Sequence, residues 1–200
     1  LDQPHPTRHH LGEIEVGQQY AVVLTTCAGL WSYVIGDTVA FEKREPPLLR
    51  FTGRTKYFLS AFGEHLISEE VESALADASR VCGVDVVDFH IGPVFPEHSA
   101  EIGRHRILAE FADPPGNVAA FQQAVDEALC RINDDYRAHR AGNTSLLAPE
   151  VVIVRPGGFT AWMRAHGKLG GQHKLPRMDN SGQLTASMAE WLHSHGATYS

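Results

Sequence analysis

The sequence predicts an α+β protein: an antiparallel β segment from the end of a larger domain, followed by a small α/β sandwich. Two observations support this. Residues 13–53 hold only strand-like runs divided by turn residues, whereas residues 54–165 alternate between strand-like and helix-like periods. A short antiparallel segment buries too little surface to stand comfortably alone, so we expect it to complete something larger. We therefore place a domain boundary between residues 53 and 54.

Three strands are expected in the first segment, at residues 20–25, 33–41 and 48–51. The pair Gly36-Asp37 is interpreted as a tight glycine turn that presents a carboxylate. An ionised carboxylate accepts hydrogen bonds from two neighbouring hydroxyls, which suits it to bind a ribose. Such turns also connect strands without any ligand, and the pair alone leaves both interpretations open.

The second segment is expected to have the order β-α-β-β-α-β, with helices on one face of a mostly antiparallel sheet. Ser68 is expected to cap the first helix, and apolar residues recur every three or four positions in the second. The expected elements are a strand at 55–59, a helix from Ser68, strands at 84–91 and 105–111, a helix from Asn117 to Tyr136, a strand at 151–154 and a helix at 159–165.

Composition excludes several classes of function. The chain has 200 residues, and 17 lysines and arginines against 24 aspartates and glutamates give a net charge of −7. That charge argues against a nucleic-acid surface or a polybasic membrane patch. No apolar run is long enough to span a bilayer and no signal peptide precedes the first strand, so we expect a cytoplasmic protein without membrane partners. Three cysteines without a C-x-x-C pair indicate neither a disulfide framework nor a metal site.

A loop rich in glycine and basic residues follows the last expected helix, at residues 167–177 (GKLGGQHKLPR). Ordering so free a loop costs conformational entropy, as expected if it closes on an anion only during a reaction. A mobile surface loop is the alternative. The chain contains no phosphate-binding P-loop, no nucleophile elbow and no H-E-x-x-H helix.

Three segments in fixed order resemble the C-terminal part of the auxin-responsive-promoter (Gretchen Hagen) family of acyl acid amido synthetases, its bacterial members in particular. They are GLWSYVIGDT at 29–38, FTGRTKYFLSAFGEHL at 51–66 and GKLGGQHKLPR at 167–177. The family belongs to the adenylate-forming superfamily. The resemblance implies a ligase that uses ATP, releases AMP and requires Mg²⁺, with a carboxylic acid as substrate and an amine such as an amino acid as acceptor.

The resemblance also assigns roles to individual residues. Asp37 matches the aspartate that binds the ribose hydroxyls, with Tyr33 beside the nucleotide. Gly53-Arg54 matches the hinge between a large and a small domain, where Arg54 reaches the ribose or phosphate. Lys174 matches the catalytic lysine of the small domain, which contacts the α-phosphate and carboxylate oxygens during adenylation. A donor of this kind stabilises charge that develops in the transition state.

The chain departs from the family pattern in two ways. First, Ser32 and Val34 flank Tyr33 where the family commonly has an arginine. Second, the large N-terminal domain of the family, with its phosphate loop and acyl pocket, is missing before residue 1. We therefore expect a fragment that is inactive alone: residues 1–53 close the large domain, and 54–200 form the mobile C-terminal domain. The alternatives are a non-catalytic binding module and a relative that forms acyl-coenzyme A.

Overall fold

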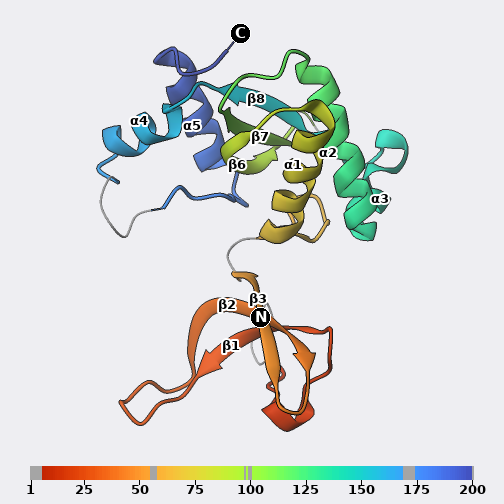
Figure 1. The fold of residues 1–200 in the computed structure, drawn as a ribbon, viewed down its shortest axis with the longest axis vertical. Coiled ribbons are helices and arrows are strands. Elements are labelled where there is room, and N and C mark those ends of the chain that lie inside the picture. Colours follow the sequence, from red (N-terminus) through yellow and green to blue (C-terminus); the bar gives the residue numbers. More distant parts are fainter. Residues whose placement is uncertain (1–5, 55–57, 97, 99–100, 169–173, 200) are drawn as a thin grey trace. The chain divides into compact units, whose positions relative to one another are not determined.

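The structure is a computed structural model that describes residues 6–54, 58–96, 98, 101–168 and 174–199. The chain divides into two compact units, Leu1–Tyr57 and Phe58–Ser200 (Figure 1). Each unit is described by itself. Mixed helix and strand content follows the predicted α+β class.

The first unit contains a three-stranded antiparallel sheet in the order β1-β2-β3, which confirms the three expected strands. The strands are β1 (Gln19–Leu24), β2 (Tyr33–Lys43) and β3 (Leu48–Arg54), preceded by a 3₁₀ turn, η1 (Leu11–Glu13). Its buried core is small: Ile14, Val39 and Phe41, with Tyr20 and Val22 packed against them.

The second unit is built on a three-stranded mixed sheet in the order β6-β7-β8. Strands β6 (Val86–Val94) and β7 (Arg104–Phe111) pair antiparallel, whereas β8 (Glu150–Val154) runs parallel to β7. The expected strand at 55–59 is described only as β4 (Phe58–Leu59). It pairs with β5 (Leu66–Ile67) in a separate ribbon rather than in the main sheet.

Five α-helices lie among the described residues of this unit. They are α1 (Ser68–Cys82), α2 (Val118–Ile132), α3 (Asp134–Arg140), α4 (Gly158–Ala165) and α5 (Gln183–Ser194), with a 3₁₀ turn, η2 (Ala141–Asn143). The expected cap at Ser68 was wrong, because Ser68 is already the first helical residue. The Glu70 carboxylate instead accepts the Ile67 amide at 2.9 Å, and the Ser68 hydroxyl donates to Glu72.

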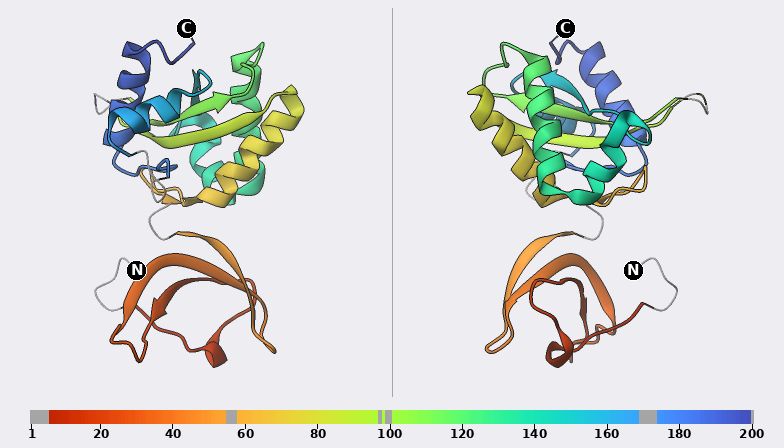
Figure 2. Two further views of the ribbon diagram at one scale, coloured as in Figure 1. Left: turned by 60° about the vertical axis from the view of Figure 1, so that its left-hand side comes forward. Right: turned by 90° about the vertical axis from the view of Figure 1, so that its right-hand side faces the viewer.

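Helices cover both faces of the main sheet, so the expectation of a single helical face was wrong (Figure 2). On one face the Phe111 ring meets the Phe121 ring of α2 edge to face, with centroids 5.1 Å apart. On the other face Leu108 packs in a core with Trp162 of α4 and Met188 of α5. Because neighbouring side chains of a strand point to opposite faces, β7 is apolar on both and needs two helical layers.

The long helix expected from Asn117 to Tyr136 breaks at Asn133, which has the extended angles φ −126° and ψ 112°. Its Oδ1 accepts the Tyr136 amide at 2.7 Å and so caps α3. Its Nδ2 donates to the His65 carbonyl at 2.7 Å and to Glu70 Oε2 at 2.9 Å. One buried amide thus starts a helix and fixes the ribbon that precedes α1.

Replacing Asn133 with alanine should lower the free energy of unfolding by about 2–3 kcal/mol, because a cap is worth about 1 kcal/mol and each buried hydrogen bond about as much again. Urea denaturation followed by circular dichroism measures the change. The matched control is Asn117→Ala, which removes an exposed cap of α2 and should cost only about 1 kcal/mol. Equal losses in the two variants would contradict the role assigned to Asn133.

Candidate functional site

In the first unit, Asp37 lies on a bulge inside strand β2 rather than in a turn. Val34 pairs with Val23 and Thr38 pairs with Ala21, so three residues of β2, 35–37, face a single residue of β1. Gly36 has φ 87°, which an L side chain rarely adopts. The expectation of a tight turn was therefore wrong, although the glycine does have the special backbone angle. A bulge re-aims the side chains beside it, and here it presents the half-buried Asp37.

The structure brings three of the predicted residues together on two neighbouring strands. Asp37 is the register partner of Arg54 in the β2–β3 ladder. Tyr33 begins β2 four positions earlier and is 53% exposed. The spacing of the motifs did not predict that Asp37 and Arg54 face each other in the register of the two strands.

A polar cluster that the sequence did not indicate lies directly beside Asp37. Gln19 Nε2 donates to Thr52 Oγ1 at 2.8 Å and to Thr38 Oγ1 at 3.3 Å, and the two threonine hydroxyls are 3.1 Å apart. Thr52 is buried and is the extra residue of a second register shift, between β2 and β3. Hydrogen bonds among side chains of three strands therefore hold β2 at Thr38, the residue after Asp37.

A cation lies beside Ser32, the residue before Tyr33, although neither position 32 nor position 34 is an arginine. Arg8 Nη1 donates to Ser32 Oγ at 2.8 Å. Ser32 has φ 52°, a left-handed angle that is uncommon outside glycine. The side chains at 32 and 34 thus provide no positive charge, but Arg8, from the segment before η1, brings one to Ser32.

In the second unit, the end of the second motif lies next to the chain that follows the third motif. The Ser60 amide, at the start of the loop before α1, donates to Asn180 Oδ1 at 3.0 Å. Gly63 of that loop has φ 93°, a left-handed angle that glycine adopts without strain. Segments 120 residues apart in sequence are therefore neighbours.

Lys174 is an exposed residue at the start of a segment that is fixed to the sheet. The next residue, Leu175, is only 8% exposed and belongs to the core. The Ile91 amide of β6 donates to the Arg177 carbonyl at 2.8 Å, and the Asp179 amide donates to the Ile91 carbonyl at 2.9 Å. Residues 169–173, which include Gly170 and Gly171 of the predicted mobile loop, lie outside the described residues. Gly167, before them, has φ 65°.

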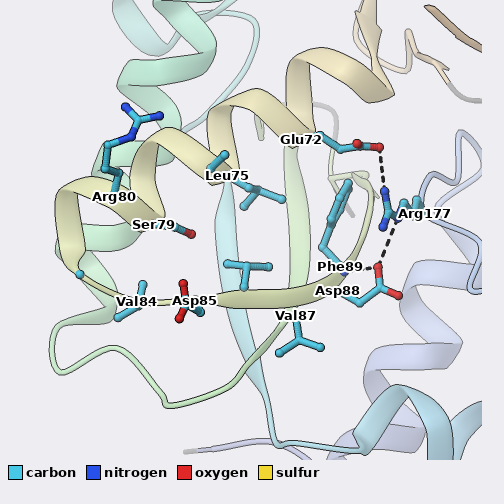
Figure 3. Close-up of a pocket in the computed structure, with 13 residues that line it drawn as sticks. Glu72, Leu75, Ser79, Arg80, Val84, Asp85, Val87, Asp88, Phe89 and Arg177 are labelled. Carbon is cyan, nitrogen blue, oxygen red and sulfur yellow. Dashed lines mark hydrogen bonds and ion pairs between the residues drawn. The ribbon is translucent and has the colours of Figure 1, made fainter. Parts of the chain in front are cut away.

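Arg177 holds the same segment from the other side. Its Nη1 donates to Glu72 Oε1 at 2.8 Å and its Nε to Asp88 Oδ1 at 3.2 Å, while its guanidinium lies 5.1 Å from the centre of the Phe89 ring. Figure 3 shows these bonds at one end of an open groove of about 580 Å³ between α1 and β6. The sequence indicated Arg177 only as a basic residue of the loop. The ion pairs of Arg177 with Glu72 and Asp88 show that it fastens the segment to α1 and β6.

A buried histidine completes the attachment. His90 of β6 is 0% exposed; its Nδ1 donates to the Pro176 carbonyl, and its Nε2 lies 2.8 Å from Thr185 Oγ1 of α5. Burial lowers the pKa of His90, although the Pro176 carbonyl and the nearby Asp179 act in the opposite direction. The ring is therefore neutral near neutral pH.

A second buried pair lies behind the loop before α1. Glu64 and His105 are 0% and 1% exposed, and Glu64 Oε1 is 3.0 Å from His105 Nε2. Burial alone would raise the pKa of Glu64, but the His105 ring and the Phe62 amide, which donates to Glu64 Oε2 at 2.8 Å, hold that pKa below its usual range. The pair fixes the turn at residues 62–65 (FGEH), within the second motif.

The predicted site residues thus fall into two sets. Asp37, Tyr33 and Arg54 belong to the first unit, and Lys174 belongs to the second. Within the described ranges, no three His, Cys, Asp or Glu side chains are grouped so as to hold a metal ion. None of the described helices has the length and apolar character that a membrane crossing requires.

Each unit matches a domain model of one protein family. Residues 2–54 match the model of the GH3 family central domain, and residues 69–183 match the model of the GH3 family C-terminal domain. The second match alone covers more than half of the chain.

Curated relatives include a jasmonoyl–L-amino acid synthetase, GH3.5, of Oryza sativa subsp. japonica, 31% identical over 179 residues. An indole-3-acetic acid-amido synthetase, GH3.3, of Arabidopsis thaliana is 27% identical over 180 residues. The alignments cover 85% and 84% of this chain but only 30% of each relative. These relatives are plant proteins, and the bacterial likeness of the motifs stays a prediction.

A solved structure of a GH3.15 acyl acid amido synthetase has the same fold, with a TM-score of 0.73 and 23% identity. The similarity covers 95% of this chain and 34% of that protein. The chain therefore spans about a third of the length of the proteins that it matches.

The folded chain should lose stability as the pH falls below 6.5, the ordinary pKa of histidine, because the unfolded chain then binds a proton that the buried His90 binds less readily. Free energies of unfolding at about pH 7.5 and about pH 5.5 measure this loss. His90→Asn, which keeps a donor for the Pro176 carbonyl and has no titrating ring, should lose less between the same two values. An equal loss in both proteins would contradict this prediction.

Proposed function

Because the chain belongs to the GH3 family, we propose that it is part of an ATP-dependent acyl acid amido synthetase. Such a ligase joins a carboxylic acid to an amine, for example an amino acid. The order of a central-domain match followed by a C-terminal-domain match supports the proposal, and so do the names of the curated relatives.

The proposed reaction has two steps. A carboxylate oxygen of the acid attacks the α-phosphorus of ATP, the bond to the β-phosphate breaks, and pyrophosphate leaves with the electron pair. The amine nitrogen then attacks the acyl carbon, AMP leaves, and the nitrogen loses a proton to give the amide. Negative charge develops on phosphoryl oxygens in the first step, where a positioned cation lowers the barrier.

The four predicted residues receive these roles. Asp37 accepts hydrogen bonds from the ribose hydroxyls, Tyr33 lies beside the nucleotide, and Arg54 offers a planar fork to ribose or phosphate. Lys174 contacts the α-phosphate and carboxylate oxygens. The observation that carries the proposal is the placement of Lys174, an exposed cation at the start of a segment whose Arg177 carbonyl and Asp179 amide are bonded to β6.

We infer that residues 1–53 close a large domain and that 54–200 form a mobile one, with a hinge at Gly53-Arg54. The relatives are about three times as long as this chain, so the acyl pocket and much of the ATP site belong to segments that the chain does not span. We therefore propose that these 200 residues alone are inactive. Magnesium is proposed to enter with the nucleotide, and we assign it no ligand in this chain.

Replacing Lys174 with alanine in the full-length protein should reduce carboxylate-dependent ATP–pyrophosphate exchange by about 10² to 10³-fold, the usual cost of removing one preorganised donor. The control is Lys43→Ala, which removes an exposed lysine at the end of β2 and should leave exchange unchanged. Normal exchange in Lys174→Ala would refute the assigned role. Absence of ATP binding by calorimetry in the unaltered full-length protein would instead favour a non-catalytic binding module.

Replacing Asp37 with alanine should raise the KM for ATP by about tenfold or more, because hydrogen bonds to a charged acceptor are worth about 1.5–3 kcal/mol. Steady-state exchange at varied ATP measures KM. Glu42→Ala removes an exposed carboxylate from the same strand and should leave KM unchanged. A KM for ATP that does not respond to Asp37→Ala excludes the ribose contact.

A further inference from the structure

Three parts of the second unit cross at one buried point: strand β6, the segment 174–179 and the first turn of α5. His90 lies at the crossing, with its Nδ1 bonded to the Pro176 carbonyl and its Nε2 2.8 Å from Thr185 Oγ1. His90 and Thr185 are 0% and 1% exposed. Neither belongs to a motif that the sequence singled out.

The chemistry of the partners fixes the ring. A carbonyl oxygen can only accept, so His90 Nδ1 carries the hydrogen and the neutral Nε2 accepts the Thr185 hydroxyl. The carboxylate of Asp179 is the charged group that faces the ring. It accepts the Thr185 amide at 3.0 Å, which ties the end of the segment to α5, and the Ser181 amide at 2.9 Å just before that helix. The Thr185 hydroxyl also lies 3.3 Å from Asp179 Oδ2, farther than its 2.8 Å from His90 Nε2.

The crossing has no spare room. A Cβ at Gly92, two positions along β6 from His90, would clash with Thr185 Oγ1 and lie 2.8 Å from the Asp179 carbonyl oxygen. The segment therefore cannot slide along the sheet edge without breaking the histidine bonds. The register of the segment against β6 therefore decides where Lys174, two residues before Pro176, extends from the surface.

We propose that His90 and Thr185 are positioning residues for Lys174. Through the Pro176 carbonyl they fix the direction in which the lysine backbone leaves the core, so that the ammonium group reaches the reacting phosphate and carboxylate oxygens. This inference rests on the proposed function of Lys174. Neither His90 nor Thr185 contacts a substrate, and their effect is on the step in which Lys174 acts.

The test uses a matched pair of variants of the full-length protein. Thr185→Val keeps the shape and removes the hydroxyl, which leaves His90 Nε2 without a donor, whereas Thr185→Ser restores the donor. We expect Thr185→Val to lower kcat of ATP–pyrophosphate exchange about tenfold to a hundredfold, since small misplacements of a catalytic group have effects of this size. The KM for ATP should stay within about twofold. Thr185→Ser should regain most of the rate.

A local measurement accompanies the kinetics. In Thr185→Val, amide hydrogen exchange should accelerate about tenfold at Asp179, which is bonded to Ile91, but not at Ala112, which is bonded to Asp85 at the far end of β6. Ser187→Ala alters an exposed hydroxyl of the same helix and serves as the control that should change neither quantity. Equal acceleration at both amides would show a general loss of stability and overturn the positioning role.

The outcomes separate the two hypotheses. If the unaltered full-length protein shows no exchange, the proposed function fails, and the role of His90 and Thr185 toward Lys174 fails with it. If the unaltered protein is active and Thr185→Val has the same kcat, only the positioning role is overturned. If Thr185→Ser is as slow as Thr185→Val, the hydroxyl is not the cause, and the inference is also overturned.

Discussion

Two backbone hydrogen bonds at Ile91 join the segment 174–179 to the edge of the main sheet, and much of the second unit depends on them. They hold the segment alongside β6, where Leu175 and Met178 are buried. The chain then continues into α5. That helix covers the face of the sheet that would otherwise expose Leu108. The interaction that completes the core therefore also sets the place of Lys174.

The candidate residues of the two units are held in different ways. In the first unit, Asp37 is held by a strand whose bulges are fixed by hydrogen bonds among Gln19, Thr38 and Thr52. In the second, Lys174 follows a glycine-rich stretch and precedes a segment bonded to the sheet. Anchoring one side of a loop removes part of the entropy that must be lost when the loop closes. These two arrangements agree with the proposed roles, in which Asp37 binds the nucleotide and Lys174 acts from the part that moves.

The sequence predicted the three strands of the sheet β1-β2-β3 and the three of the sheet β6-β7-β8, but not the short β5, because hydrophobic period is a local property. It failed where the structure depends on contacts distant in sequence. The apolar period runs through Asn133 without a break, and only the bonds of its side chain to His65 and Glu70 explain the interruption. Gly36 looked like a turn because a positive φ serves a bulge equally well. Helix α5 was missed because Thr185 occupies its buried stripe, where a polar residue is unexpected.

The motifs pointed to Asp37, Tyr33, Arg54 and Lys174 as candidates, but nothing in the sequence pointed to the buried side chains behind Lys174. His90 and Thr185 are 95 positions apart, and each alone is an ordinary residue of a strand or a helix. An apolar crossing of β6, α5 and the segment would be at least as stable, since buried polar groups gain little net free energy. It would not specify one register, however, because apolar contacts have no direction. A donor aimed at the Pro176 carbonyl and an acceptor aimed at Thr185 are satisfied in a single arrangement. The satisfied bonds of the buried histidine therefore favour the proposed positioning role over a contribution to the stability of the core.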